Sequence, residues 1–128
     1  MAWSFDADRP IFQQIADILT ARILAGQYAP GEKLPAVREL ALEAGVNPNT
    51  MQRALADVEA QGLVFTRRGD GRYVSKEEQA VQKARQQSAA RYMDEMIAAL
   101  TALGIAPGDI PGLVEAHLKQ GEEKRRTV

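Results

Sequence analysis

Residues 45–50 read GVNPNT and separate two segments whose apolar residues recur at helical spacing. Asn47 followed by Pro48 favours a helix start, because the asparagine side chain caps free N–H groups and proline fits the first turn. We therefore predict a short helix over residues 36–44, a tight turn, and a second helix over residues 48–61.

The neighbouring segments extend this pattern in both directions. A run of isoleucine and leucine at three- and four-residue steps predicts a helix over 10–25, and at most a short strand is expected around 33–34. Residues 63–67 and 72–74 are rich in β-branched and aromatic residues. They flank Asp70-Gly71, a good hairpin signal because the tight turn needs positive φ. Helix, short helix, turn, helix and hairpin is the order of a winged helix-turn-helix.

The composition changes after Ser75. Residues 77–103 lack glycine and proline and are rich in Ala, Glu, Gln, Lys and Arg, which predicts one long helix with a mostly polar first half. A turn around Pro107 follows, and then a last helix over about 111–119. The charged tail, residues 121–128, is expected to fray.

The expected fold class is therefore mostly α with a small β-hairpin. A winged helix-turn-helix domain over 1–76 is followed by a two-helix C-terminal dimerisation region over 77–128. Each of the two last helices has one apolar stripe, which is too little to bury a core alone. The polar first half of the long helix argues against close packing on the first domain, so self-association is favoured over a hairpin folded back on that domain. The expected dimer interface contains Tyr92, Met93, Met96, Ile97, Leu100, Leu103, Leu113, Val114 and Leu118.

Composition limits the classes of function. The 128 residues contain no cysteine and one histidine, His117, so we expect no disulfide scaffold, no metal site, no cofactor and no histidine-based triad. The net charge of −1 excludes a globally basic nucleic-acid binder but allows a local basic patch. No apolar run approaches the roughly 18 residues of a membrane helix, and no secretory signal is visible. A cytoplasmic protein without a membrane partner is expected.

One face of the helix over 48–61 suits the reading of double-stranded DNA. Its apolar residues cluster on one side, and the opposite side carries amide, guanidinium and small side chains. In the major groove Asn or Gln pairs with adenine and Arg with guanine. Any surface helix turns polar residues outward, but the preceding short helix and turn favour DNA binding here. The candidate contacts are Asn47, which acts first as the N-cap, and Asn49, Thr50, Gln52 and Arg53.

The hairpin is the second candidate DNA contact. Three arginines crowd into its turn with Asp70 as the one acid, although the whole chain is slightly acidic. A thin tip flanked by arginines can enter a minor groove or lie along phosphates, whereas the plain alternative is a solvated turn. The candidate residues are Arg67, Arg68, Gly69, Gly71 and Arg72.

Arg38 lies near the start of the short helix, the element that crosses the DNA backbone in a helix-turn-helix. We expect it to contact a phosphate. The alternative is a surface ion pair with Glu39 or Glu43, worth under about 1 kcal/mol. A methionine and aromatic stripe such as Tyr92 and Met93 is more often core than a ligand pocket, so the sequence identifies no small-molecule effector.

Taken together, these motifs resemble the winged-helix domain of GntR-type bacterial transcription regulators. The resemblance covers about residues 9–75 by motif and 77–128 only by length and helical pattern. The NPNT segment and the short C-terminal part resemble the YtrA-like subfamily. The stretches that carry the resemblance are 34–41 (LPAVRELA), 46–50 (VNPNT) and 66–74 (TRRGDGRYV).

The resemblance implies a homodimeric repressor that binds a palindromic operator, often one controlling its own operon and neighbouring transporter genes. It implies roles for single residues as well. Arg38 matches the family's backbone-contacting arginine, and Gly71 matches the wing tip. Asn49, Thr50 and Arg53 match contacts of the recognition helix.

Three residues depart from the family pattern. Ala36 stands where the family usually has a serine helix cap, at a cost of about 1 kcal/mol, Leu55 replaces a commoner tyrosine with an effect on packing only, and Arg72 replaces a usual threonine. All three leave the DNA-binding inference intact and the operator sequence open. The competing function is a winged-helix adaptor whose arginines meet an acidic protein surface, and salt-dependent binding to random duplex DNA separates the two. A small enzyme is disfavoured for want of a catalytic constellation.

Overall fold

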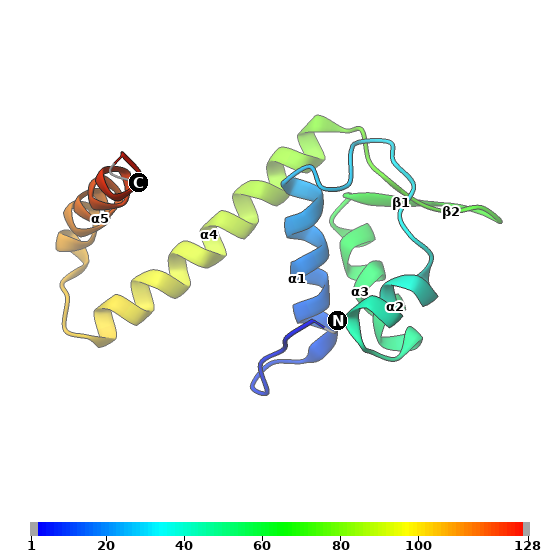
Figure 1. The fold of residues 1–128 in the computed structure, drawn as a ribbon, viewed down its shortest axis with the longest axis horizontal. Helices are drawn as coiled ribbons and strands as arrows, with labels where there is room; N and C mark the ends of the chain where they lie inside the picture. The colour runs from blue at the N-terminus through cyan, green and yellow to red at the C-terminus, as the bar shows by residue number, and fades with distance from the viewer. Residues whose placement is uncertain (1–2, 127–128) are drawn as a thin grey trace. The chain divides into compact units, whose positions relative to one another are not determined.

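The computed structural model describes residues 3–126, which form two compact units that meet between Gln86 and Gln87 in the sequence. The first unit contains three helices, a hairpin and the first turns of a long fourth helix (Figure 1). Its elements are α1 (Ile11–Leu24), α2 (Val37–Ala44), α3 (Pro48–Ala60), β1 (Val64–Arg67), β2 (Gly71–Val74) and the start of α4 (Glu78–Ala102).

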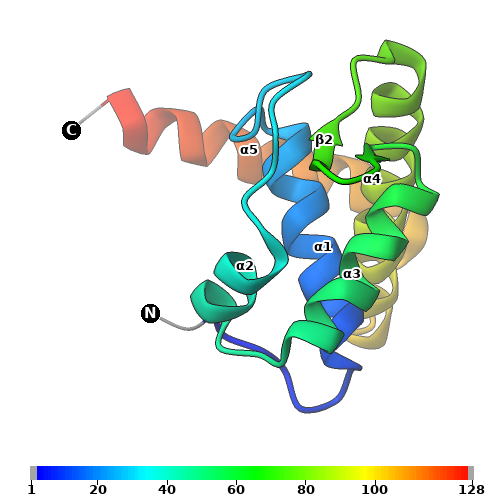
Figure 2. The same cartoon turned by 90° about the vertical axis from the view of Figure 1, so that its right-hand side faces the viewer.

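The core of the first unit lies between α1 and α3, which run side by side, with α2 packed against α3 (Figure 2). Helical spacing places Ile15 and Leu19 of α1 against Met51 and Leu55 of α3, and Leu40 of α2 joins them; all five are fully buried. Each such side chain contributes about 1.5–3 kcal/mol by leaving water. This packing fixes α3 and leaves its opposite face to solvent.

The turn between α2 and α3 has the predicted chemistry. Gly45 ends α2 in the left-handed conformation, with φ of 74°, which glycine adopts without strain. Asn47 caps α3, because its Oδ1 accepts the N–H of Asn49 at 2.7 Å, and Pro48 occupies the first turn. At the start of α2, Ala36 makes no side-chain cap hydrogen bond.

The two strands form an antiparallel hairpin, with Phe65 opposite Tyr73. Its turn differs from the predicted Asp-Gly type: residues 68–70 form the loop, and Gly69 rather than Asp70 has the left-handed φ, at 78°. The short strand expected around 33–34 is present as a bridge between Lys33 and Tyr73, so the loop before α2 lies along the hairpin.

An arm before α1 is fastened to α2. The indole of Trp3 donates to Glu43 Oε2 at 2.9 Å, and the Arg22 guanidinium binds the same oxygen at 2.7 Å. Arg22 also lies over the Trp3 ring, with 4.6 Å from its central carbon to the ring centroid. The Arg22 hydrogen bond, opposed in part by burial and assisted by Trp3, holds the pKa of Glu43 below its usual value.

The first turns of α4 belong to the N-terminal unit. Ala84 is 2% exposed within that unit's core, and Val81 packs against the same core. Arg85 donates to the carbonyl oxygen of Leu24 at 3.1 Å. Through these contacts the first compact unit extends to Gln86, past the boundary at 76 that the sequence suggests.

The C-terminal unit consists of the remainder of α4, a 3-10 turn η1 (Pro107–Asp109) and α5 (Ile110–Arg126). The prediction that the tail frays from residue 121 was wrong for the described residues, since α5 continues to Arg126. Three cations, Lys124, Arg125 and Arg126, occupy its last turn, where they complement the helix dipole. Residues 127 and 128 of the expected frayed tail lie outside the described residues.

Within residues 3–126, no single helix is both long and apolar enough to cross a membrane. α4 and α5 have the length and apolar composition of a membrane span only when they are taken together, and a bend separates them.

Candidate nucleic-acid interface

The outward face of α3 carries the side chains that the sequence predicts to contact DNA bases, and we call it the reading face. Asn49, Gln52 and Arg53 are exposed, and Ala56, one turn further along the helix, adds no bulk that would hold a partner away. The side chains of Asn49 and Gln52 make no hydrogen bond to any other residue in the range 3–126. Their amides are therefore available to external donors and acceptors, in the pattern that reads adenine.

Arg53 is held differently from its neighbours. Its guanidinium lies over the ring of Phe12 on α1, 3.7 Å from the centroid, in a cation–π contact. Ile11, Phe12, Asn49, Thr50 and Arg53 line a shallow depression beside the reading face. Arg53 therefore lies toward the α1 flank of the face, and its guanidinium starts from a restricted position.

Arg38 is exposed near the start of α2, as its predicted role requires. The alternative that the sequence left open, a surface ion pair with Glu39 or Glu43, does not form among the described residues, and Glu43 instead binds Arg22 and Trp3. Among the described residues Arg38 has no ion pair or hydrogen bond through its guanidinium. Its charge is free to meet a phosphate.

The three arginines of the hairpin do not share one face. Successive strand residues point to opposite sides, so Arg67 lies on the side of Phe65 and Tyr73, and Arg72 lies on the side of the buried Val74. Arg68 is in the turn and exposed. The hairpin, which projects from the helices in Figure 1, thus carries positive charge on both faces and at its tip.

The β1–β2 hairpin, which is the wing of the fold, carries a side-chain cluster that the sequence did not predict. The carboxylate of Asp70 accepts from Lys33 Nζ at 2.9 Å and from the Tyr73 hydroxyl at 2.6 Å, and Arg67 lies 4.4 Å from the centroid of the Tyr73 ring. The Tyr73 hydrogen bond, followed by that of Lys33, lowers the pKa of Asp70, and the bond to Asp70 raises the pKa of Lys33. Phe65 stacks on Tyr73 with 5.9 Å between ring centroids.

Sequence reasoning therefore missed Phe12, Lys33 and Tyr73. The weak strand signal at 33–34 was the one sequence feature that pointed to the role of Lys33, but local sequence does not show which strand this segment pairs with. Phe12 occupies an ordinary position in an amphipathic helix, and its contact with Arg53 depends on how α1 crosses α3.

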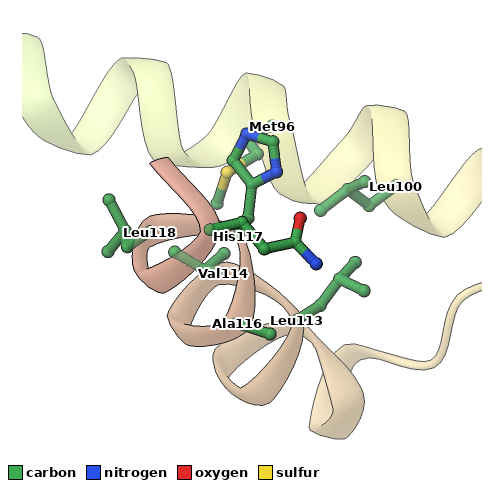
Figure 3. Close-up of a pocket in the computed structure, with 8 residues that line it drawn as sticks. Met96, Leu100, Leu113, Val114, Ala116, His117 and Leu118 are labelled. Carbon is green, nitrogen blue, oxygen red and sulfur yellow. The ribbon is translucent and has the colours of Figure 1, made fainter. Parts of the chain in front are cut away.

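The residues predicted for a dimer interface are all exposed or half-buried. Among residues 87–126 the single buried side chain is Ile110, at 6% exposure. Leu103 is 76% exposed, Leu118 61% and Tyr92 53%. A groove of about 500 Å³ lies between α4 and α5, and among its lining residues the His117 ring lies beside Met96 (Figure 3). Its other lining residues are Leu100, Leu113, Val114, Ala116, Leu118 and Gln120.

The chain matches the family model of bacterial regulatory proteins of the gntR family over residues 11–74. It is 35% identical over 101 residues to the uncharacterized HTH-type transcriptional regulator YhcF of Bacillus subtilis, covering 79% of this chain and 84% of YhcF. It is 44% identical over 66 residues to the HTH-type transcriptional repressor YtrA of the same organism, covering 52% of this chain and 51% of YtrA.

Solved structures extend the similarity to the C-terminal helices. A GntR family transcriptional regulator from Listeria monocytogenes has a TM-score of 0.77 and 34% identity, covering 88% of this chain and 98% of that one. The structure of AraR(DBD) in complex with operator ORX1 has a TM-score of 0.53 and 27% identity, covering 56% of this chain and 93% of that one. This chain therefore belongs to the GntR family of bacterial regulatory proteins, as a DNA-binding transcription regulator with a winged helix-turn-helix and not an enzyme.

Proposed function

We propose that this regulator binds a palindromic operator as a homodimer and represses transcription by blocking the access of RNA polymerase to the promoter. The observation that carries the proposal is the outward face of α3, whose Asn49 and Gln52 amides have no partner among residues 3–126. Recognition of base edges needs polar side chains that are not bonded within the protein and that stand on a firmly packed helix.

Contacts to the sugar-phosphate backbone would come from three places around this face. Arg38 at the start of α2 has an unpaired guanidinium, and Arg68 is exposed in the hairpin turn. Asn47 keeps its side chain for the cap of α3, so a phosphate would meet the helix N-terminus beside it. Such contacts position a protein on DNA without reading its sequence.

Self-association is supported by how few side chains of residues 87–126 are buried. With Ile110 as the one buried side chain among residues 87–126, the α4–α5 pair leaves Tyr92, Met93 and Ile97 in water. Burying such side chains recovers about 1.5–3 kcal/mol each, so a second copy is the simplest cover for this surface. Isologous pairing of two copies gives two-fold symmetry, which a palindromic site matches.

Repression is supported by a relative. YtrA, with 44% identity over 66 residues, is named as a transcriptional repressor, and the AraR structure contains operator DNA. A dimer bound across a promoter can act sterically, without a bound effector.

Selection of bound fragments from a random DNA library tests the proposal. We expect a two-fold symmetric site whose half-sites lie one helical turn, about 34 Å, or a multiple of it apart. In parallel, sedimentation equilibrium should give twice the chain mass of 14.0 kDa. Recovery of asymmetric sites, or a monomeric protein at the concentrations that saturate DNA, would contradict the homodimer.

A further inference from the structure

Lys33 is built into the wing although it is far from the hairpin in sequence. It bridges to Tyr73, and the neighbouring Leu34 donates its N–H to the carbonyl oxygen of Arg72 at 2.8 Å. On the other side, the N–H of Val74 donates to the carbonyl oxygen of Glu32 at 2.9 Å. These backbone bonds hold the Lys33 side chain over the hairpin.

Gly71 shows how closely the lysine approaches. A Cβ atom at Gly71 would lie 2.9 Å from Cε of Lys33, and its φ of 152° also disfavours other residues. The aliphatic part of the Lys33 side chain therefore crosses the hairpin over Gly71, which has no side chain. Its ammonium group reaches Asp70 Oδ1 at 2.9 Å.

Asp70 binds the groups that a DNA phosphate would otherwise use. Its two oxygens take one ammonium donor, from Lys33, and one hydroxyl donor, from Tyr73. The carboxylate also lies beside Arg67, which covers the Tyr73 ring. Both polar partners are solvent-accessible, and a phosphate that takes the same donor hydrogens has to displace or share the carboxylate.

We propose that Asp70 is an affinity-limiting residue of the DNA-binding surface: it competes with DNA phosphates for Lys33 and Tyr73 and so weakens the contact of the wing with any duplex. This inference rests on the proposed function, because it assumes that the wing lies against DNA. Phosphate contacts carry no sequence information and supply essentially all of non-specific binding, so an internal anion at the wing lowers the affinity for every duplex, random sequences included.

A mainly structural role for the cluster is less consistent with its exposure. Lys33 and Asp70 retain 51% and 43% of their side-chain accessibility, and such exposed pairs contribute little to folding. Asp70→Asn keeps a turn-forming residue before Gly71, so the hairpin should survive the substitution. The variant removes the charge and leaves the backbone as it is.

The test compares Asp70→Asn with Glu122→Gln, which removes the same charge from an exposed position on α5. Binding to a random-sequence duplex and to the selected operator is measured by fluorescence anisotropy from 50 to 200 mM salt. One additional phosphate contact predicts tighter binding of the random duplex by between about threefold and about tenfold, with a salt slope steeper by about 0.9. The selected operator should gain by the same factor, so that the ratio of operator to random affinity stays unchanged, and Glu122→Gln should behave as the unchanged protein.

A second background shows whether Lys33 transmits the effect. In Lys33→Met protein, Asp70→Asn should change random-duplex binding by much less than in the unchanged protein. A full gain in that background would overturn the proposal, and so would an Asp70→Asn variant that binds random DNA no better than Glu122→Gln. Failure of the unchanged protein to bind any duplex would instead overturn the proposed function.

Discussion

Arg53 and Arg68 separate two tasks at the scale of single residues. Arg53 lies beside the reading face of α3, whereas Arg68 is exposed in the wing turn. Arg53→Ala should relax base preference at one position of the operator at a cost of about 1–3 kcal/mol, because a bidentate base contact is lost. Arg68→Ala should weaken all duplexes alike and lower the salt slope by about one unit.

Competition between the selected operator and single-base variants of it measures both effects. Arg53→Lys is the matched control, because it keeps the charge and loses the fork that pairs with guanine. Equal losses on operator and random duplex for both alanine variants would contradict this division of tasks.

Glu43 gives a pH-dependent prediction. The hydrogen bond from Arg22 lowers the pKa of Glu43 in the folded state, so its contribution to stability is present above the unfolded pKa of about 4.3 and is lost as pH falls through the lower folded pKa. Glu43→Gln should reduce the free energy of unfolding at pH 7 by less than about 1 kcal/mol, since the pair is partly exposed. At strongly acid pH the difference should vanish.

Urea unfolding followed by the fluorescence of Trp3, the one tryptophan, measures this directly, because its indole contacts Glu43. Asp94→Asn, on α4 outside this network, is the control for a change of net charge. A difference that persists unchanged at acid pH would show that Glu43 acts through packing and not through its charge.

At the scale of elements, the two caps of the helix-turn-helix lead to opposite expectations. Ala36 at the start of α2 has an extended backbone, with φ −62° and ψ 152°, but no side-chain acceptor. Ala36→Ser should add a cap bond and raise the free energy of unfolding by about 1 kcal/mol. Asn47→Ala should lower it by a similar amount, because the 2.7 Å bond to Asn49 is lost. Unfolding by urea measures both, and a destabilised Ala36→Ser variant would contradict the cap model.

Elements specified by local signals were predictable from the sequence. Asn47-Pro48 fixes the start of α3, and apolar periodicity fixes α1, whose observed bounds Ile11–Leu24 lie one residue inside the prediction at each end. The hairpin was also predicted, although its left-handed residue is Gly69 and not Asp70. Local chemistry determines these features, because turns and caps involve residues within a few positions of each other.

Features that depend on how elements cross were not predictable. The stack of Arg53 on Phe12 and the pairing of Lys33 with Asp70 join residues 41 and 37 positions apart. The outward direction of Asn49 and Gln52 could be derived from the helical repeat alone. The continuation of α5 to Arg126 escaped prediction because Gly121 and the following charges are typical of a frayed end.

At the scale of the whole molecule, the proposed dimer gives a direct test. Ile97→Asp puts a charge into the exposed apolar stripe of α4, where it stays hydrated in a single copy but would be buried on pairing. We expect sedimentation to shift from dimer to monomer and operator affinity to fall by more than about tenfold, because a monomer makes one half-site contact. Trp3 fluorescence should remain unchanged.

Gln87→Glu, an exposed polar position on the same helix, is the matched control for added charge. It should remain dimeric. A monomeric Gln87→Glu, or a dimeric Ile97→Asp with full operator affinity, would place the contact between copies elsewhere.

Because Ile110 is the one buried side chain among residues 87–126, the stability of that part of the chain depends on how many copies of this regulator are present. If pairing supplies the missing core, dilution weakens the packing of that unit as well as the hold on DNA, since association depends on concentration. In a cell with few copies, unpaired chains would be the ones most open to proteases. A low copy number would then shorten the lifetime of the protein. The degree of repression would therefore change more than in proportion to the rate at which the protein is synthesised.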